Sequence, residues 1–274
     1  MKKLLKVFSM PYFNTIDCVI SAYRLIWRER AYLLKLAAIP LFIKFSFYMI
    51  ATMYGEEGNV IRLSVFMVPA YFAEGWMLCH FIRLISNGQR WPYQMTGDDA
   101  EDLRVVKRRA KPLLAGVVSF VLINLFIALY FTIFKYFTPP EMMNGGDIKP
   151  EDISKGTAIT IIFLFALMVA GFKLVWLYVP MAANMKATMY IERMRGFGIT
   201  VRLIGLWLLC FVPVMVLMQI LISPFLAVET QAASVQVLIS IMVVIFDTLK
   251  NLIVTAGMTL AILQITQGHN KGKG

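Results

Sequence analysis

Long apolar runs, each interrupted by a few polar residues, recur along the whole 274-residue chain. About 20 consecutive apolar residues suffice to cross the hydrocarbon core of a bilayer as a helix. By that measure the sequence predicts six spans, at about residues 32–53, 60–85, 112–137, 157–179, 203–222 and 234–264. The expected fold is therefore an all-α membrane protein with six transmembrane helices, and residues 1–274 are expected to form a single polytopic membrane domain.

Basic amphipathic segments precede these spans. Residues 13–30, FNTIDCVISAYRLIWRER, predict a helix whose apolar and charged positions separate onto two faces. The apolar face carries Ile16, Ile20, Tyr23 and Trp27, and the charged face carries Asp17, Arg24 and Arg28. Such a helix is typical of the cytoplasmic membrane interface, and a helix packed against another protein is the alternative. We expect the basic segments 99–111 and 184–195 to lie on the same surface.

The distribution of Lys and Arg sets the expected orientation. Most of them lie in the N-terminal segment, in the loops 86–111 and 181–202, and in the tail, and few lie in the external loops apart from Arg62, Lys149 and Lys155. Under the positive-inside rule, both termini are then cytoplasmic. The same alternation divides the chain into three similar hairpin units, 13–85, 96–180 and 184–266. An ancestral repeat and simple positive-inside alternation both explain this pattern.

The charge balance also bears on partners. The formal net charge is +11, while only 16% of the residues are charged and 59% are hydrophobic. Because the basic residues gather at one end of each span, they favour anionic phospholipids over nucleic acid as partners. The candidate lipid contacts are Arg24, Arg28, Arg108, Arg109, Arg193 and Arg195.

A few polar residues lie within the apolar runs. They are Lys44, Glu74, Lys173, Asp247, Lys250 and Asn251. Counted at about 1.5 Å per residue, the charged ones lie near the midplane of a hydrocarbon core about 30 Å thick. A charge facing lipid at that depth costs at least about 2.5–3.5 kcal/mol, so these side chains are expected to face the helix bundle.

The spacing of these residues predicts their pairing. Asp247 and Lys250 are three residues apart and share a helix face. Glu74 then needs Lys44 or Lys173 as its partner, unless Lys173 extends to the inner interface instead. Such a cluster forms either an ion or solute site or a set of ion pairs that holds helices in register. A water-accessible cavity at Glu74 and Asp247 would favour the first interpretation, and a dry ion pair would favour the second.

Motifs of catalysis are missing from the sequence. There are only two histidines, and no GxSxG, Walker or GxGxxG pattern occurs. The acidic group at 98–102 lacks the spacing of a calcium loop and suits the start of a helix. The three cysteines share no metal-ligand spacing. We therefore expect no catalytic residue, metal or cofactor.

Two segments carry a resemblance to known proteins. The run SAYRLIWRERAYLLKLAAIPLF and the later segment KLVWLYVPMAAN resemble a broad group of uncharacterised bacterial six-span proteins. This group is similar to the membrane domain that precedes some glycerophosphodiester phosphodiesterases. The resemblance implies the six-span architecture and a bacterial inner-membrane location, but no phosphodiesterase activity, because no catalytic domain is present. The expected function is a non-catalytic scaffold, accessory or lipid-interacting component, with a small-solute or ion transporter or channel as the alternative.

Overall fold

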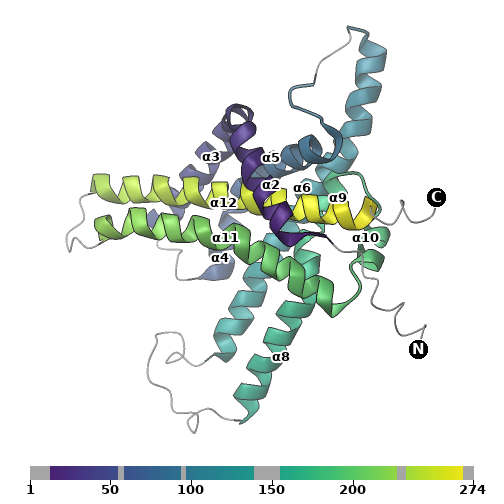
Figure 1. Cartoon of the computed structure of the whole chain (residues 1–274). Helices are drawn as coiled ribbons and strands as arrows, with labels where there is room; N and C mark the ends of the chain where they lie inside the picture. Colours follow the sequence, from purple (N-terminus) through teal and green to yellow (C-terminus); the bar gives the residue numbers. More distant parts are fainter. Residues whose placement is uncertain (1–12, 55–58, 94–96, 139–154, 227–232, 268–274) are drawn as a thin grey trace, which may run out of the picture.

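The computed structural model describes residues 13–54, 59–93, 97–138, 155–226 and 233–267, and this part of the chain is mostly helical, without strands (Figure 1). The loop at 139–154 and the tail at 268–274, both used in the topology prediction, lie outside the described residues. The elements in order are α2 (Thr15–Arg28), α3 (Arg30–Met53), α4 (Val60–Phe66), α5 (Val68–Asn87), α6 (Asp99–Phe137), α8 (Lys155–Gly171), the 3₁₀ helix η4 (Phe172–Trp176), α9 (Tyr178–Ala182), α10 (Ala187–Arg193), α11 (Phe197–Leu226) and α12 (Ala233–Gln267).

The predicted membrane architecture is confirmed. Five stretches of helix are long and apolar enough to cross a bilayer, and α4 with α5 makes a sixth that is bent by 63°. The bend has a local cause, because Pro69 stands in the first turn of α5 and cannot donate a hydrogen bond back into α4. The protein is therefore an all-α, multi-pass membrane protein.

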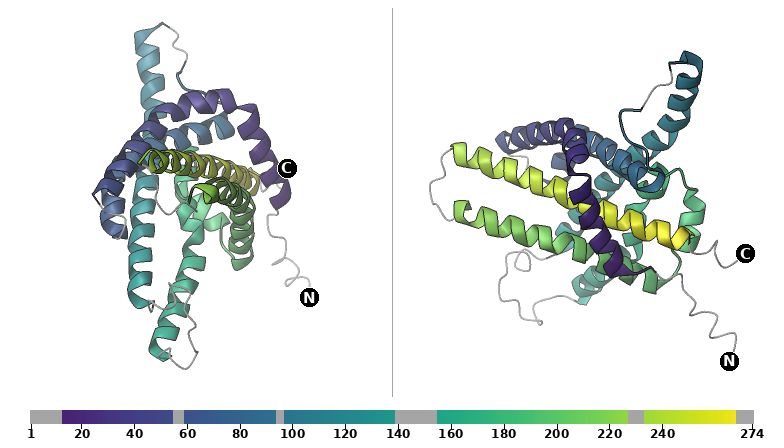
Figure 2. Two further views of the ribbon diagram at one scale, coloured as in Figure 1. Left: turned by 90° about the vertical axis from the view of Figure 1, so that its left-hand side faces the viewer. Right: turned by 45° about the horizontal axis from the view of Figure 1, so that its top comes forward.

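The third span differs from the prediction at its inner end. The basic segment 99–111 was expected as a separate helix along the membrane surface, but α6 runs without a break through Pro112. Pro112 removes only one backbone donor, the one that would bond the Arg108 carbonyl, and the Arg83 guanidinium of α5 donates to the neighbouring Arg109 carbonyl at 2.5 Å. The basic segment is thus the first part of a 39-residue helix, and it projects beyond the bundle (Figures 1 and 2).

The helix α2 lies across α11 and α12 (Figures 1 and 2). Asn14 caps it by accepting hydrogen bonds from two backbone amides of its first turn, as the sequence suggests. Its buried residues are the small ones, Cys18 and Ala22, whereas Ile16 and Trp27 are 63% and 71% exposed. The helix therefore buries its small side chains most deeply, packs Tyr23 partly against the core and leaves Ile16, Ile20 and Trp27 uncovered by the protein.

The core forms where α5 passes between α3, α6, α9 and α12. Two glycines allow close helix approach there. A Cβ atom at Gly116 would lie 2.8 Å from both the Ala182 Cβ and the Cys79 Sγ, and one at Gly257 would lie 2.9 Å from the Cys210 Sγ. Because real Cβ atoms do not come so close, only glycine permits these contacts, as small residues do in many membrane bundles.

Two long hairpins leave this core in different directions. The ends of α11 and α12 that face residues 227–232 point left in Figure 1, and the ends of α6 and α8 that face residues 139–154 point downward. The helix α8 packs loosely, with Leu164 its one buried residue. The surface between α6 and α8 is consequently less filled than the core.

Candidate functional site

The midplane charges meet in one network across three helices. The Lys44 ammonium of α3 lies 2.8 Å from both carboxylate oxygens of Glu74 on α5 and 2.5 Å from the Asp247 Oδ2 on α12. The Lys250 ammonium donates to the other oxygen of Asp247. The Asn251 Nδ2 donates to the Glu74 Oε1 at 2.7 Å. Lys44 thus lies between two carboxylates, and its removal would leave both with less compensation.

Helix periodicity explains which α12 residues take part. Positions 247, 250 and 251 follow the i, i+3, i+4 spacing, so they share one face of α12, and that face is turned toward α3 and α5. The predicted contact between Asp247 and Lys250 is present. Of the two partners considered for Glu74, the structure selects Lys44.

Burial differs along the network. The side chains of Lys44 and Glu74 are 9% and 4% exposed, whereas those of Lys250 and Asp247 are 19% and 33% exposed. Two carboxylates and two ammonium groups give a formal charge of zero. The network is therefore a neutral set with a dry end at Glu74 and a more open end at Asp247.

Lys173 does not join this network, contrary to the sequence-based expectation. It lies in η4, where the chain leaves α-helical winding after Gly171, and this changes the faces on which the following side chains fall. In the described part of the chain no ion pair involves its ammonium, and its backbone carbonyl accepts a hydrogen bond from the Tyr190 hydroxyl at 2.5 Å.

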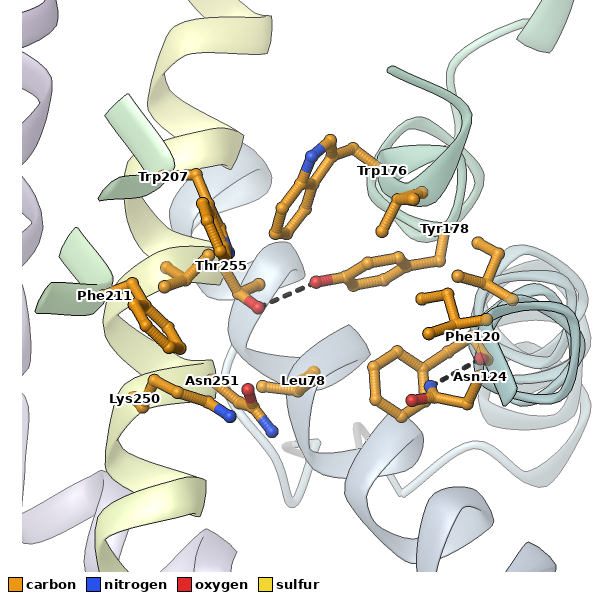
Figure 3. Close-up of a pocket in the computed structure, with 14 residues that line it drawn as sticks. Leu78, Phe120, Asn124, Trp176, Tyr178, Trp207, Phe211, Lys250, Asn251 and Thr255 are labelled. Carbon is orange, nitrogen blue, oxygen red and sulfur yellow. Dashed lines mark hydrogen bonds between the residues drawn. The ribbon is translucent and has the colours of Figure 1, made fainter. Parts of the chain in front are cut away.

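A cavity of about 160 Å³ lies beside the network (Figure 3). Lys250 and Asn251 form part of its wall, and the Tyr178 and Thr255 hydroxyls, 2.8 Å apart, form another part. Asn124 of α6 donates to the Phe120 carbonyl at 2.9 Å and completes the polar lining. The remaining wall is rich in aromatic rings, from Phe120, Trp176, Trp207 and Phe211. The sequence analysis missed this cavity, because its wall comes from five helices, α5, α6, α9, α11 and α12, and from the 3₁₀ helix η4.

A second polar cluster, also missed, surrounds His80 in the C-terminal half of α5. The His80 ring lies 4.6 Å from the Trp76 ring and 5.1 Å from the Trp91 ring, measured between centroids. His80 and Arg83 are 1% and 4% exposed, and each has a buried nitrogen without a hydrogen-bond partner. His80 sits among apolar residues in the sequence, so no local pattern indicated that Trp91, from the following loop, would cover it.

The candidate lipid-binding arginines fall into two groups. Arg24, Arg28, Arg108 and Arg195 are exposed. Arg109 stacks over the Tyr93 ring at 4.5 Å, and the Arg193 guanidinium donates to the Thr266 carbonyl at the end of α12. Arg193 thus satisfies a terminal carbonyl of a helix, an intramolecular role that its position in the sequence does not indicate.

The cysteines are free thiols, and all three are buried. Burial, and to a lesser extent the neighbouring Asp17 carboxylate, raises the pKa of the Cys18 thiol to about 11. Within the described residues, no three His, Cys, Asp or Glu side chains gather as metal ligands would. These thiols therefore pack as small apolar groups.

Comparisons with known proteins do not extend this description. Neither the protein-family models, nor the curated proteins, nor the solved structures give a match to the chain. They therefore do not connect the chain with the six-span proteins that its sequence resembles. The geometry of the charge network and of the adjoining cavity is what any assignment of function rests on.

Proposed function

We propose that the protein is a non-catalytic component of the bacterial inner membrane, a scaffold or accessory subunit that contacts anionic lipid through its cytoplasmic face. The observation that carries this proposal is the charge network, in which every charged group has an opposite partner. Lys44 and Glu74 pair directly, and Asp247 lies between Lys44 and Lys250.

The physical argument concerns what a buried charge must do in a membrane. A charged side chain at the bilayer centre is costly unless it is paired. Removing one member of a buried pair is strongly destabilising, because the other is left uncompensated. A neutral, mostly dry network therefore favours a fixed arrangement of α3, α5 and α12 over a site that exchanges ions.

The lipid contact rests on separate residues. Arg24 and Arg28 are exposed on α2, beside apolar side chains that the protein leaves uncovered. Basic residues next to an anionic membrane surface contribute about 1 kcal/mol each. An inner membrane with both termini in the cytoplasm is the location that fits the distribution of Lys and Arg.

A transporter of protons or small cations is the second candidate, because the Asp247 side chain is 33% exposed. Reconstitution into sealed vesicles with an internal pH dye separates the two. The scaffold proposal expects the wild type to leave an imposed proton or sodium gradient unchanged, as protein-free vesicles do. Gradient-driven flux that Asp247→Asn abolishes, and that the exposed control Asp99→Asn preserves, would reject the scaffold and establish transport.

A further inference from the structure

A large apolar groove lies on the loosely packed side of the bundle, between α6, α8, η4 and α11. Its volume is about 590 Å³, within the range of about 300–1,000 Å³ that is usual for small-molecule sites. Its wall includes Phe126, Tyr130, Leu167, Met168, Phe172 and Ile204. All of these residues belong to predicted spans or to their continuation, so the groove faces the hydrocarbon region and suits an alkyl chain.

The groove and the cavity beside the charge network adjoin each other. Ile123, Ile127, Val175, Trp176 and Trp207 line both of them. The groove is apolar along most of its length, and the polar side chains lie in the cavity next to it. This division into a long apolar part and a short polar part matches the shape of an amphiphile.

The polar end has a definite electrostatic character. Among the described residues that line the cavity, Lys250 is the one with a charge, while the carboxylates of Asp247 and Glu74 lie behind that wall. The Lys250 ammonium has three donor hydrogens and uses one on Asp247, so two remain for a ligand. Figure 3 shows its nitrogen beside Asn251 at the edge of the cavity. The cavity wall therefore favours oxygen acceptors, and most of all an anionic oxygen.

The volume of the cavity limits which head groups it can hold. At about 30 Å³ per water, a cavity of about 160 Å³ holds about five waters. A carboxylate or a phosphate monoester fits this space, whereas the large head group of a sugar-bearing lipid does not. The hydroxyls of Tyr178 and Thr255 and the amide of Asn124 offer further hydrogen-bonding groups around the head.

We propose that this site binds a single-chain anionic amphiphile, with its hydrocarbon chain in the groove between α6 and α8 and its carboxylate or phosphate head at Lys250. The proposal goes beyond lipid contact at the cytoplasmic face, since the site shares no residue with the basic surfaces. An ordinary bilayer chain resting in the groove is the competing occupant, and it would show no dependence on the head group.

Quenching of tryptophan fluorescence by brominated chains tests the proposal directly, because Trp176 and Trp207 line both parts of the site. The full-length protein in lipid nanodiscs would be titrated with a chain-brominated fatty carboxylate, the matching alkyl phosphate and the matching fatty alcohol. We expect at least one of the two anions to bind about tenfold more tightly than the alcohol, which is the effect of one charge-assisted hydrogen bond. The anion that binds more tightly shows whether the head group of the ligand is a carboxylate or a phosphate.

Two pairs of variants locate the binding. A Cβ atom at Gly171 or at Gly205 would meet no atom within 4 Å, so both positions have room for a side chain. Gly171 lines the groove and Gly205 does not. Gly171→Leu should weaken all three ligands, and the control Gly205→Leu should leave them unchanged. Lys250→Met should remove the preference for anions, and Lys250→Arg should keep it.

The outcomes that overturn the proposal are equally definite. Equal binding of the alcohol and both anions by the wild type would show that the groove holds only an ordinary bilayer chain. Unchanged binding in Gly171→Leu would place the ligand elsewhere. Should Lys250→Met fail to fold, retention of the anion preference in Lys250→Arg and loss of binding in Gly171→Leu would still support the site. Loss of the preference in a folded Lys250→Arg, with wild-type behaviour of Gly171→Leu, would reject it.

Discussion

Lys44 is the residue on which the charge network depends most. It contacts both carboxylates, at 2.8 Å and 2.5 Å, and its side chain is 9% exposed. Lys44→Met keeps the unbranched shape and removes the charge. Glu74 then retains one hydrogen bond, from Asn251, and its side chain is 4% exposed. The formal charge of the network changes from zero to −1 in a place that water reaches poorly.

Removing one partner of a buried ion pair costs about 3–5 kcal/mol of unfolding free energy, and we expect Lys44→Met to fall in this range. The double variant Lys44→Met with Glu74→Gln restores neutrality, because Asp247 and Lys250 remain paired. It should return to within about 1 kcal/mol of the wild type, since a neutral replacement of a buried pair is often tolerated. Asp247→Asn should cost less, about 1–3 kcal/mol, because it leaves the pair of Lys44 and Glu74 intact.

Reversible unfolding in mixed micelles, followed by circular dichroism and tryptophan fluorescence, measures these free energies. A double-mutant cycle over Lys44 and Glu74 isolates their coupling. The reasoning would be refuted if Lys44→Met were as stable as the wild type. It would also be refuted if adding Glu74→Gln made the protein less stable than Lys44→Met alone, because the loss would then not come from an uncompensated carboxylate.

Three further predictions concern the topology, the contact with lipid and the packing of the helices. A cysteine placed in 143–148 should react with a membrane-impermeant maleimide added outside intact cells, and one placed in 97–100 should react only after lysis, because the basic loops are predicted inside. The double variant Arg24→Gln with Arg28→Gln should bind anionic lipid more weakly than the wild type, by about 2 kcal/mol. The exchange of spin-labelled lipids on the detergent-free protein measures this difference. Gly116→Val should lower thermal stability strongly, because a Cβ atom there would lie 2.8 Å from Ala182 and Cys79.

Each of these has a clear contrary result. Labelling at 97–100 from outside intact cells would show that the topology is opposite to the predicted one. If the arginine double variant and the wild type had the same selectivity for anionic lipid, α2 would not belong to the lipid-binding surface. Normal stability of Gly116→Val, judged beside the unobstructed control Gly205→Val, would show that α5, α6 and α9 do not pack as closely as described. The native thiols should not interfere with labelling, since all three are buried, and burial raises the pKa of the Cys18 thiol to about 11.

The sequence by itself determined the class of the protein, the number of apolar runs and the residues that cannot face lipid. These properties are local, because hydropathy and helix periodicity are readable within one span. The pairing of Asp247 with Lys250 belongs to this group, since three residues along a helix place both side chains on one face. The cap at Asn14 is local in the same sense.

The tertiary structure alone decided how the spans approach one another. It selected Lys44 over Lys173 as the partner of Glu74, because the 3₁₀ winding of η4 changes the faces of the fourth span. In the tertiary structure α6 also continues through Pro112, because the effect of a single proline depends on whether neighbouring side chains donate hydrogen bonds to the backbone carbonyls near it. The groove arises where α8 packs loosely against α6, and the cavity arises where α5, α6, η4, α9, α11 and α12 meet, so neither can be predicted from one helix alone.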